Sequence, residues 1–145
     1  MKAAAFVLLL GAAACSSTSG PFDGTTDPAL LADRSWRLER VDADGNGSGA
    51  PVAADLSVTF TSSGGVGGMA GPNHYGGSYS ASASGDIELS NVTSTLIGGP
   101  DAERAGEYLQ HMLRAHSFTV TATELRLRFS ARGVLIFRGM VLAPT

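Results

Sequence analysis

The sequence is short of cysteine, of clustered basic charge and of long apolar runs. Its 145 residues include a single cysteine, Cys15, so no disulfide can form within the chain. The 10 basic residues are scattered along the chain among 13 acidic ones, and the formal net charge is −3. This balance provides no electrostatic footprint for nucleic acid and no polybasic lipid patch, so we expect no nucleic-acid partner.

No apolar stretch approaches the roughly 20 residues that a membrane-spanning helix needs. The longest, Ala3 to Ala14, is too short and ends at the polar residues Ser16 and Ser17, just after Cys15. We therefore expect the body of the protein to carry no transmembrane helix.

The motifs of common enzymes are also missing. There is no Gly-x-Ser-x-Gly nucleophile elbow, and the glycines of residues 64–71 are not followed by the Lys-Ser or Lys-Thr of a phosphate-binding loop, so turns and bulges explain them. The histidines His74, His111 and His116 lack metal-ligand spacing, and His111 is interpreted as a solvated ion pair with Glu107. We predict no enzymatic activity, no metal and no cofactor.

One short segment matches half of a calcium loop. Asp42, Asp44, Asn46 and Gly47 place oxygen ligands at alternate positions and a glycine at the sharp turn. The closing acid is missing, because Ala53 stands at the twelfth position, and the flanking residues are typical of strands. A plain hairpin turn is therefore the favoured interpretation.

The N-terminus has the layout of a secretion signal, with the positive Lys2, an apolar run and three alanines before Cys15. The position of Cys15 resembles the lipobox of bacterial lipoproteins, with Ala12 where that family prefers Leu. The resemblance implies that the signal is removed and that Cys15 carries lipid, and Ser16 instead of Asp implies the outer membrane, facing the periplasm. Ordinary signal cleavage, which leaves a free thiol, is the alternative.

The predicted organisation has three parts: a signal peptide in residues 1–14, a lipid-anchor cysteine with a flexible tether in residues 15–29, and a folded domain in residues 30–141. The tether consists mostly of Ser, Thr, Gly, Pro and Asp, which bury too little apolar surface to become ordered. A coil of this length would hold the domain roughly 20 Å from the anchor.

The domain is predicted to be α+β, with an antiparallel sheet of seven or eight short strands that curls toward a barrel, and one helix packed on it. Alternating apolar residues, as in Leu56, Val58 and Phe60, indicate the strands, and the last one is apolar enough to be covered on both faces. We expect strands at residues 35–41, 56–60, 76–81, 86–89, 92–97, 118–120, 125–129 and 134–137. The last three should form a meander.

The single helix is expected over residues 101–116, with Pro100 at its first position. One face carries the apolar residues, which are Ala102, Ala105, Leu109, Met112 and Leu113. The residues expected in the core are Trp36, Phe60, Leu109, Leu113, Leu127 and Phe137.

Residues 68–79 resemble the hallmark of the META domain, found in HslJ-type heat-shock lipoproteins, which runs Gly-x-x-Gly-Cys-Asn-x-Tyr-x-Gly-x-Tyr. The matching positions are Gly68, Gly71, Asn73, Tyr75, Gly77 and Tyr79, and Pro72 stands in place of the cysteine.

Residues 94–101 are similar to a second block of that family, Ser-Thr-x-Met-Ala-Cys-Pro-Asp, with Thr95 matching and Gly99 in place of the cysteine. The resemblance covers about Leu31 to Arg138. We hypothesise that relatives join the two cysteine positions by a disulfide, so we expect the Cα atoms of Pro72 and Gly99 to lie within about 7 Å.

The resemblance implies a fold and a compartment, and attaches no common reaction to the family. We expect a lipid-anchored, non-enzymatic envelope protein that binds a protein or a small ligand, or that supports tolerance of envelope stress. Its contact with the membrane would be through the N-terminal lipid. The alternative is an envelope hydrolase or metal-dependent enzyme that uses Asn73, His74 and Tyr75, which a concave polar pocket around His74 would favour.

Overall fold

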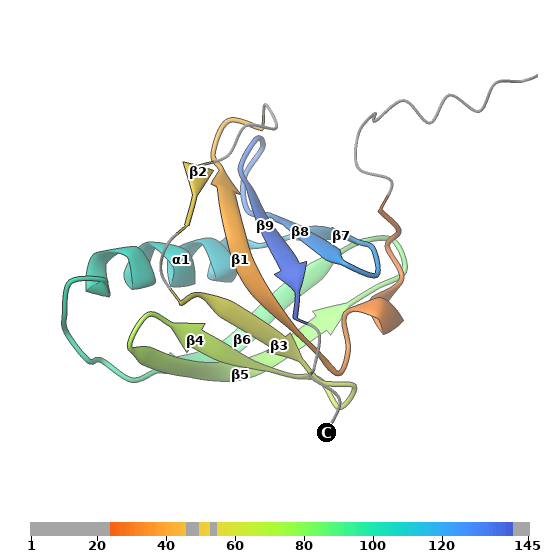
Figure 1. Cartoon of the computed structure of the whole chain (residues 1–145). Coiled ribbons are helices and arrows are strands. Elements are labelled where there is room, and N and C mark those ends of the chain that lie inside the picture. The colour runs from red at the N-terminus through yellow and green to blue at the C-terminus, as the bar shows by residue number, and fades with distance from the viewer. Residues whose placement is uncertain (1–23, 46–49, 53–54, 141–145) are drawn as a thin grey trace, which may run out of the picture.

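The computed structural model of the chain describes residues 24–45, 50–52 and 55–140 (Figure 1). The predicted signal peptide, the anchor cysteine Cys15 and the start of the tether lie outside the described residues. So do Asn46, Gly47 and Ala53 of the incomplete calcium loop.

Over the described residues the fold is a curled antiparallel sheet with one α-helix, as expected from the sequence (Figure 1). The strand order is β6-β5-β4-β3-β1-β9-β8-β7, and the short β2 pairs with β1. The strands are β1 (Arg34–Asp42), β2 (Ala50–Pro51), β3 (Ser57–Phe60), β4 (Gly65–Ala70), β5 (Asn73–Ala81), β6 (Ile87–Ser94), β7 (Ser117–Val120), β8 (Glu124–Arg128) and β9 (Val134–Gly139). The helices are the 3-10 turn η1 (Pro28–Leu30) and α1 (Ala102–Arg114).

The two edge strands of the sheet, β6 and β7, meet and close the curl. The backbone N–H of Ile87 donates to the carbonyl of His116 at 3.1 Å, and that of Phe118 donates to the carbonyl of Gly85 at 2.9 Å. These few bonds satisfy backbone groups that an open edge would leave exposed.

The end of the predicted tether is folded against this closure. Thr25 and Val120 exchange two backbone hydrogen bonds, of 2.9 and 2.8 Å, so the prediction of a flexible segment up to residue 29 is wrong for its last part. The amino-acid composition of the segment did not indicate this pairing, because the hydrogen bonds are made by its backbone. The edge of β7 offers backbone N–H and C=O groups to which any extended chain can bind.

The expected strands are present, with two differences. Strand β4 was interpreted as turns because it is rich in glycine, yet Val66 and Ala70 face the core from it. The two strands expected at residues 86–89 and 92–97 are one strand, β6. Its alternation is interrupted at Asn91, whose φ is 52°, beside a register shift opposite Gly76 and Ser78.

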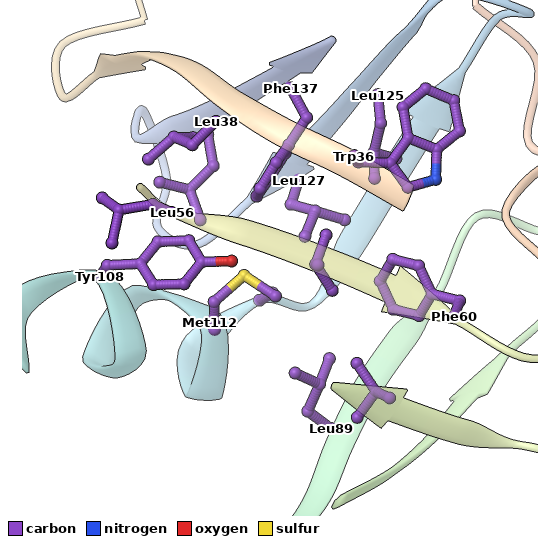
Figure 2. Close-up of a cluster of buried hydrophobic side chains, with 14 of the residues drawn as sticks. Trp36, Leu38, Leu56, Phe60, Leu89, Tyr108, Met112, Leu125, Leu127 and Phe137 are labelled. Carbon is purple, nitrogen blue, oxygen red and sulfur yellow. The ribbon is translucent and has the colours of Figure 1, made fainter. Parts of the chain in front are cut away.

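Of the six residues expected in the core, four are buried as predicted, and for the other two the prediction is wrong. Trp36, Phe60, Leu127 and Phe137 are fully buried, but Leu113 is 53% exposed and Leu109 is only partly buried. The helix instead buries a row at i, i+3 and i+7, made of Ala105, Tyr108 and Met112. Figure 2 shows Tyr108 and Met112 pointing from α1 toward Leu56 and Leu127.

The rotation of α1 explains the correction, since each residue advances a helix by about 100°. Tyr108 and Met112 each precede one of the expected leucines by one position, so the helix is turned by one residue about its axis.

Pro100 also lies before the helix, which begins at Ala102 with Asp101 as its N-cap residue. In β9, by contrast, Leu135, Ile136 and Phe137 are buried in succession, as predicted for a strand covered on both faces.

Candidate functional site

The motif residue Asn73 fastens the segment between β6 and α1 to the start of β5. Its Oδ1 accepts hydrogen bonds from Thr95 Oγ1 at 2.9 Å and from the backbone N–H of Ile97 at 2.6 Å, and its Nδ2 donates to the carbonyl of Ile97 at 3.2 Å. Thr95 Oγ1 in turn accepts from the backbone N–H of His74 at 3.1 Å. The two family blocks are thus joined by one polar network, and the Asn73 amide is used within it.

The motif residue Tyr75 forms a second internal cluster with Tyr108 and the carbonyl of Ser57. The hydroxyl groups of Tyr75 and Tyr108 lie 2.6 and 2.9 Å from Ser57 O and 2.8 Å from each other. Two hydroxyl protons serve these three contacts, so only two are hydrogen bonds at any moment. A side chain on Gly68 would collide with the carbonyl oxygen of Ser57, which explains the glycine there.

Burial raises the pKa of both tyrosine hydroxyls. For Tyr75 desolvation is the main cause, opposed by the hydrogen bond with Tyr108. For Tyr108 desolvation raises the pKa, and the neighbouring Tyr75 raises it further. Both side chains therefore remain neutral phenols at physiological pH, in a structural role.

The remaining motif residues shape the backbone of β4 and β5. Gly71 has a φ of +62° in the turn between these strands, and a Cβ there would lie 3.6 Å from that of Asp101, so the turn packs on the start of α1. Gly77 lies so close to Ser90 that a Cβ would approach its carbonyl oxygen to 2.7 Å. The Tyr79 hydroxyl donates to Thr61 O at 2.9 Å. The motif supports the fold.

The structure does not bring Asn73, His74 and Tyr75 together. Successive residues of a strand point to opposite faces, and here Asn73 and Tyr75 are buried whereas His74 is exposed. The polar atoms of Asn73 and Tyr75 are already engaged with backbone and hydroxyl partners. No catalytic arrangement of these three residues follows from this geometry.

The two positions that replace cysteine line one shallow hollow. Pro72 and Gly99 lie around a cavity of about 280 Å³ that Gly71, Pro100 and Asp101 also line. A Cβ at Gly99 would meet no atom within 4 Å, although its φ of +149° favours glycine. A disulfide between these positions in relatives would require that the two residues lie near each other, as they do around this hollow. The distance between their Cα atoms stays a prediction.

An apolar cavity of about 270 Å³ lies between α1, strand β1 and the chain between β2 and β3. Its apolar walls come from both sides of the fold and are Leu38, Val41, Val52, Leu56 and Tyr108. Three polar residues of α1, Arg104, Glu107 and His111, also line it and follow one another at i, i+3 and i+7 along one helix face. The cavity combines an apolar interior with positive, negative and imidazole groups.

His111 differs from the solvated ion pair expected of it. Its ring stacks on Phe129 with the ring centroids 4.0 Å apart, and its Nδ1 is buried without a hydrogen-bond partner in the described part of the chain. Burial lowers the pKa of His111, the carboxylate of Glu107 opposes that effect, and Arg114 adds to it. The side chain is therefore neutral at physiological pH. Sequence reasoning missed this, because the contact with Phe129 depends on how α1 is rotated.

The residues of the incomplete calcium loop that the structure describes form a turn. Asp42 is buried, and its Oδ1 accepts a hydrogen bond from the backbone N–H of Gly45 at 2.8 Å.

Across residues 24–45, 50–52 and 55–140 no three His, Cys, Asp or Glu side chains gather closely enough to hold a metal ion. Within the same residues no helix has the length and apolar character needed to cross a membrane.

Comparison with known proteins gives a family match and several similar folds. A family model described as "META domain" matches residues 29–140. An NMR structure of a protein from Burkholderia xenovorans is similar, with a TM-score of 0.66 and 22% identity over 81% of this chain and 91% of that one. A crystal structure of a DUF4847 family protein from Bacteroides vulgatus has a TM-score of 0.60 and 14% identity over 77% and 95% of the two chains.

At these identities the similar structures establish the fold alone. No curated protein matches this chain. The match over residues 29–140 spans the whole sheet, the helix and both motif blocks.

Proposed function

Because the chain belongs to the META domain family, we propose that it is a non-enzymatic binding module of the bacterial cell envelope. In this proposal lipid on Cys15 holds the module at the outer membrane, facing the periplasm, and the cavity between α1 and the sheet takes a small amphipathic ligand. The observation that carries the proposal is that cavity, because it joins apolar walls to ionisable groups on one helix face.

The walls of the cavity favour an apolar body in the ligand. Leu38, Leu56 and Tyr108 are almost fully buried and belong to the core, so this side of the cavity is held rigidly. Val41 and Val52 are partly buried and lie against the core cluster. A ligand that covers them gains roughly 25 cal/mol for each Å² of apolar surface removed from water.

The polar residues of α1 favour a ligand with a polar or anionic end. Arg104 supplies a positive charge and a planar set of donors, and Glu107 restricts the orientations that an anionic group can adopt beside it. The unpartnered Nδ1 of His111 provides a further polar site. A buried polar atom without a partner costs about 1–3 kcal/mol, so a ligand that pairs with it gains affinity.

An amphipathic fluorescent probe tests the proposed pocket. Anilinonaphthalene sulfonate has apolar rings for the walls and a sulfonate for Arg104, and its emission rises when it leaves water. We expect the full chain to bind it and Val52→Phe, which fills the cavity, to bind it about tenfold more weakly, which is about 1.4 kcal/mol. Titration followed by fluorescence measures both dissociation constants.

The control removes an exposed apolar side chain elsewhere. Leu96 is 95% exposed on the segment before α1, so Leu96→Ser should leave probe binding within about twofold of the original chain. If Val52→Phe binds the probe as tightly as the original chain, or if Leu96→Ser weakens binding as much as Val52→Phe, the cavity is not the binding site.

A further inference from the structure

Arginines that are far apart in the sequence gather on the outer face of β1, β9 and β8. Phe137 points into the core, so its neighbours Ile136 and Arg138 point to the opposite, outer face, together with the residues opposite them on the adjacent strands; Ile136 is itself buried there. The strand registers place Arg37 opposite Arg138, and Ile136 between Arg40 and Arg126. The fold thus concentrates positive charge that is scattered along the chain.

Carboxylates accompany only part of this arginine face. Glu39 lies 3.2 Å from Arg138, Glu124 lies 3.3 Å from Arg126, and Asp55 lies 3.4 Å from Arg37. Two further arginines, Arg40 and Arg128, make no ion pair with any residue that the structure describes. The face therefore keeps an excess of positive charge on a chain whose net charge is negative.

At the β7 end of this face lies a groove of about 430 Å³. Two arginines and four hydroxyl groups line it, and no carboxylate does; its lining residues are Thr26, Ser84, Gly85, Ser117, Phe118, Thr119, Arg126, Arg128 and Val134. The N-terminal segment supplies one wall, because Thr26 Oγ1 donates to the carbonyl of Ala83 at 2.6 Å, and this segment runs beside β7 (Figure 1).

The groups in the groove form a regular array. Thr119 lies opposite Arg126 and Ser117 lies opposite Arg128, so each arginine has a hydroxyl neighbour on the adjacent strand. The two arginines are two positions apart on β8, which places their Cα atoms about 7 Å apart on one face. The hydroxyl groups of Ser117 and Thr119 make no hydrogen bond to the described residues.

Both guanidinium groups are held at the groove by contacts of their own. Arg126 donates from Nε and Nη2 to Glu124 Oε1 at 3.4 and 3.3 Å, and Arg128 donates from Nη1 to the carbonyl of Ala131 at 3.3 Å. A guanidinium that is already oriented loses less rotamer freedom when it binds an anion.

We infer that this groove binds a phosphate group, carried on a small hydroxylated molecule or on a lipid headgroup. A phosphate presents three terminal oxygens and up to two negative charges, so two arginines and their neighbouring hydroxyls match it. A carboxylate offers only two oxygens, which one arginine satisfies. The site is separate from the cavity at α1, and its ligand is recognised by charge instead of apolar contact.

Calorimetric titration of the full chain, kept in a neutral detergent, tests the inference. The probes are inorganic phosphate, glucose 6-phosphate, glucose, glucuronate as the carboxylate, and mixed micelles of the detergent and phosphatidylcholine with or without phosphatidic acid, whose headgroup is a phosphate monoester. We expect at least one phosphate probe to bind about tenfold or more tightly than glucuronate, and glucose not to bind. Preference for glucose 6-phosphate over phosphate shows that the hydroxylated body is recognised, and binding only to the micelles that contain phosphatidic acid assigns the source to lipid.

Three variants connect the binding to the groove. Arg128→Gln should weaken phosphate binding about tenfold, and Thr119→Val, which removes only a hydroxyl, should weaken it severalfold. Arg114→Gln changes the net charge equally but lies exposed on α1, so it should stay within about twofold. Thermal unfolding checks that each variant is folded.

Two results overturn the inference. One is the absence of binding by every phosphate probe to the folded chain. The other is an equal loss of affinity in Arg114→Gln and Arg128→Gln, which would show that net charge attracts the anion without a defined site.

Discussion

At the scale of single residues, the hydroxyls of Tyr75 and Tyr108 connect the sheet to the helix through one backbone oxygen. Both lie against Ser57 O, and both are buried, so ionising either would place a charge in the core beside a carbonyl dipole. Burial raises both pKa values above that of an exposed tyrosine. This pair makes the stability of the fold sensitive to alkali.

We expect the free energy of unfolding to fall as the pH rises above about 10. There the unfolded chain loses tyrosine protons that the folded chain keeps, so each buried tyrosine lowers stability by about 1.4 kcal/mol for each further pH unit. The stabilisation is complete below the unfolded pKa and is lost as the pH approaches the folded pKa. Urea unfolding across this alkaline range measures the slope.

The double variant Tyr75→Phe, Tyr108→Phe should have a much flatter slope, whatever its stability at neutral pH. Tyr79→Phe is the comparison, because Tyr79 is less buried and its hydroxyl bonds to a different carbonyl, that of Thr61. An alkaline slope that is unchanged in the double variant would contradict the role given to the pair.

At the scale of elements, the sequence patterns predicted most strands and the helix but not how the elements face one another. The apolar stripe of α1 is wide enough to include Tyr108 and Met112 or Leu109 and Leu113, and only packing against the sheet, chiefly against β6 and β4, selects the first pair. The cavity beside Tyr108 depends on that selection, so no sequence pattern could have located it. Strand β4 was missed for a related reason: its glycines serve close contacts between strands.

The hollow at the start of α1 allows a test of the hypothesised cysteine pairing between the β4–β5 turn and the segment before the helix. The double variant Pro72→Cys, Gly99→Cys should form a disulfide under mild oxidation. It closes a loop of about 28 residues, for which chain entropy gives roughly 3–4 kcal/mol. Strain at Gly99, whose φ is +149°, reduces this gain. The melting temperatures of the oxidised and reduced forms measure it.

The reduced double variant and Pro72→Cys alone separate the effect of the bridge from that of the substitutions. Failure to form the disulfide in the folded chain would show that the two Cα atoms lie beyond its reach, which is about 7 Å.

At the scale of the whole molecule, the fold class and the curling of the sheet toward a barrel were predictable, whereas the charge on its outer face was not. Alternation in each strand indicates which residues face the core. It does not indicate which strands are neighbours, and the arginine face exists only because β1, β9 and β8 lie side by side. The internal hydrogen bonds of the motif residues, which no sequence pattern shows, make these residues part of the scaffold.

The proposed attachment to the membrane depends on Cys15. Labelled palmitate should be incorporated into the full chain expressed in a bacterium, and Cys15→Ser should lose the label and move from the membrane to the soluble fraction, because two or three acyl chains are needed for stable anchoring. Ser17→Ala keeps the cysteine and should retain both label and membrane. Membrane retention of Cys15→Ser, with no label in the original chain, would contradict lipid anchoring.

The pairing of Thr25 with Val120 also determines how the fold responds to mechanical load. Tension along the N-terminal segment acts first on the two hydrogen bonds between these residues and on the bond from Thr26 to Ala83. Their rupture would release the segment while the bonds that join β6 to β7 remain in place. The segment around Thr25 and Thr26 should therefore detach before the sheet unfolds. A pull strong enough to detach it would lengthen the tether and remove one wall of the groove that Arg126 and Arg128 line.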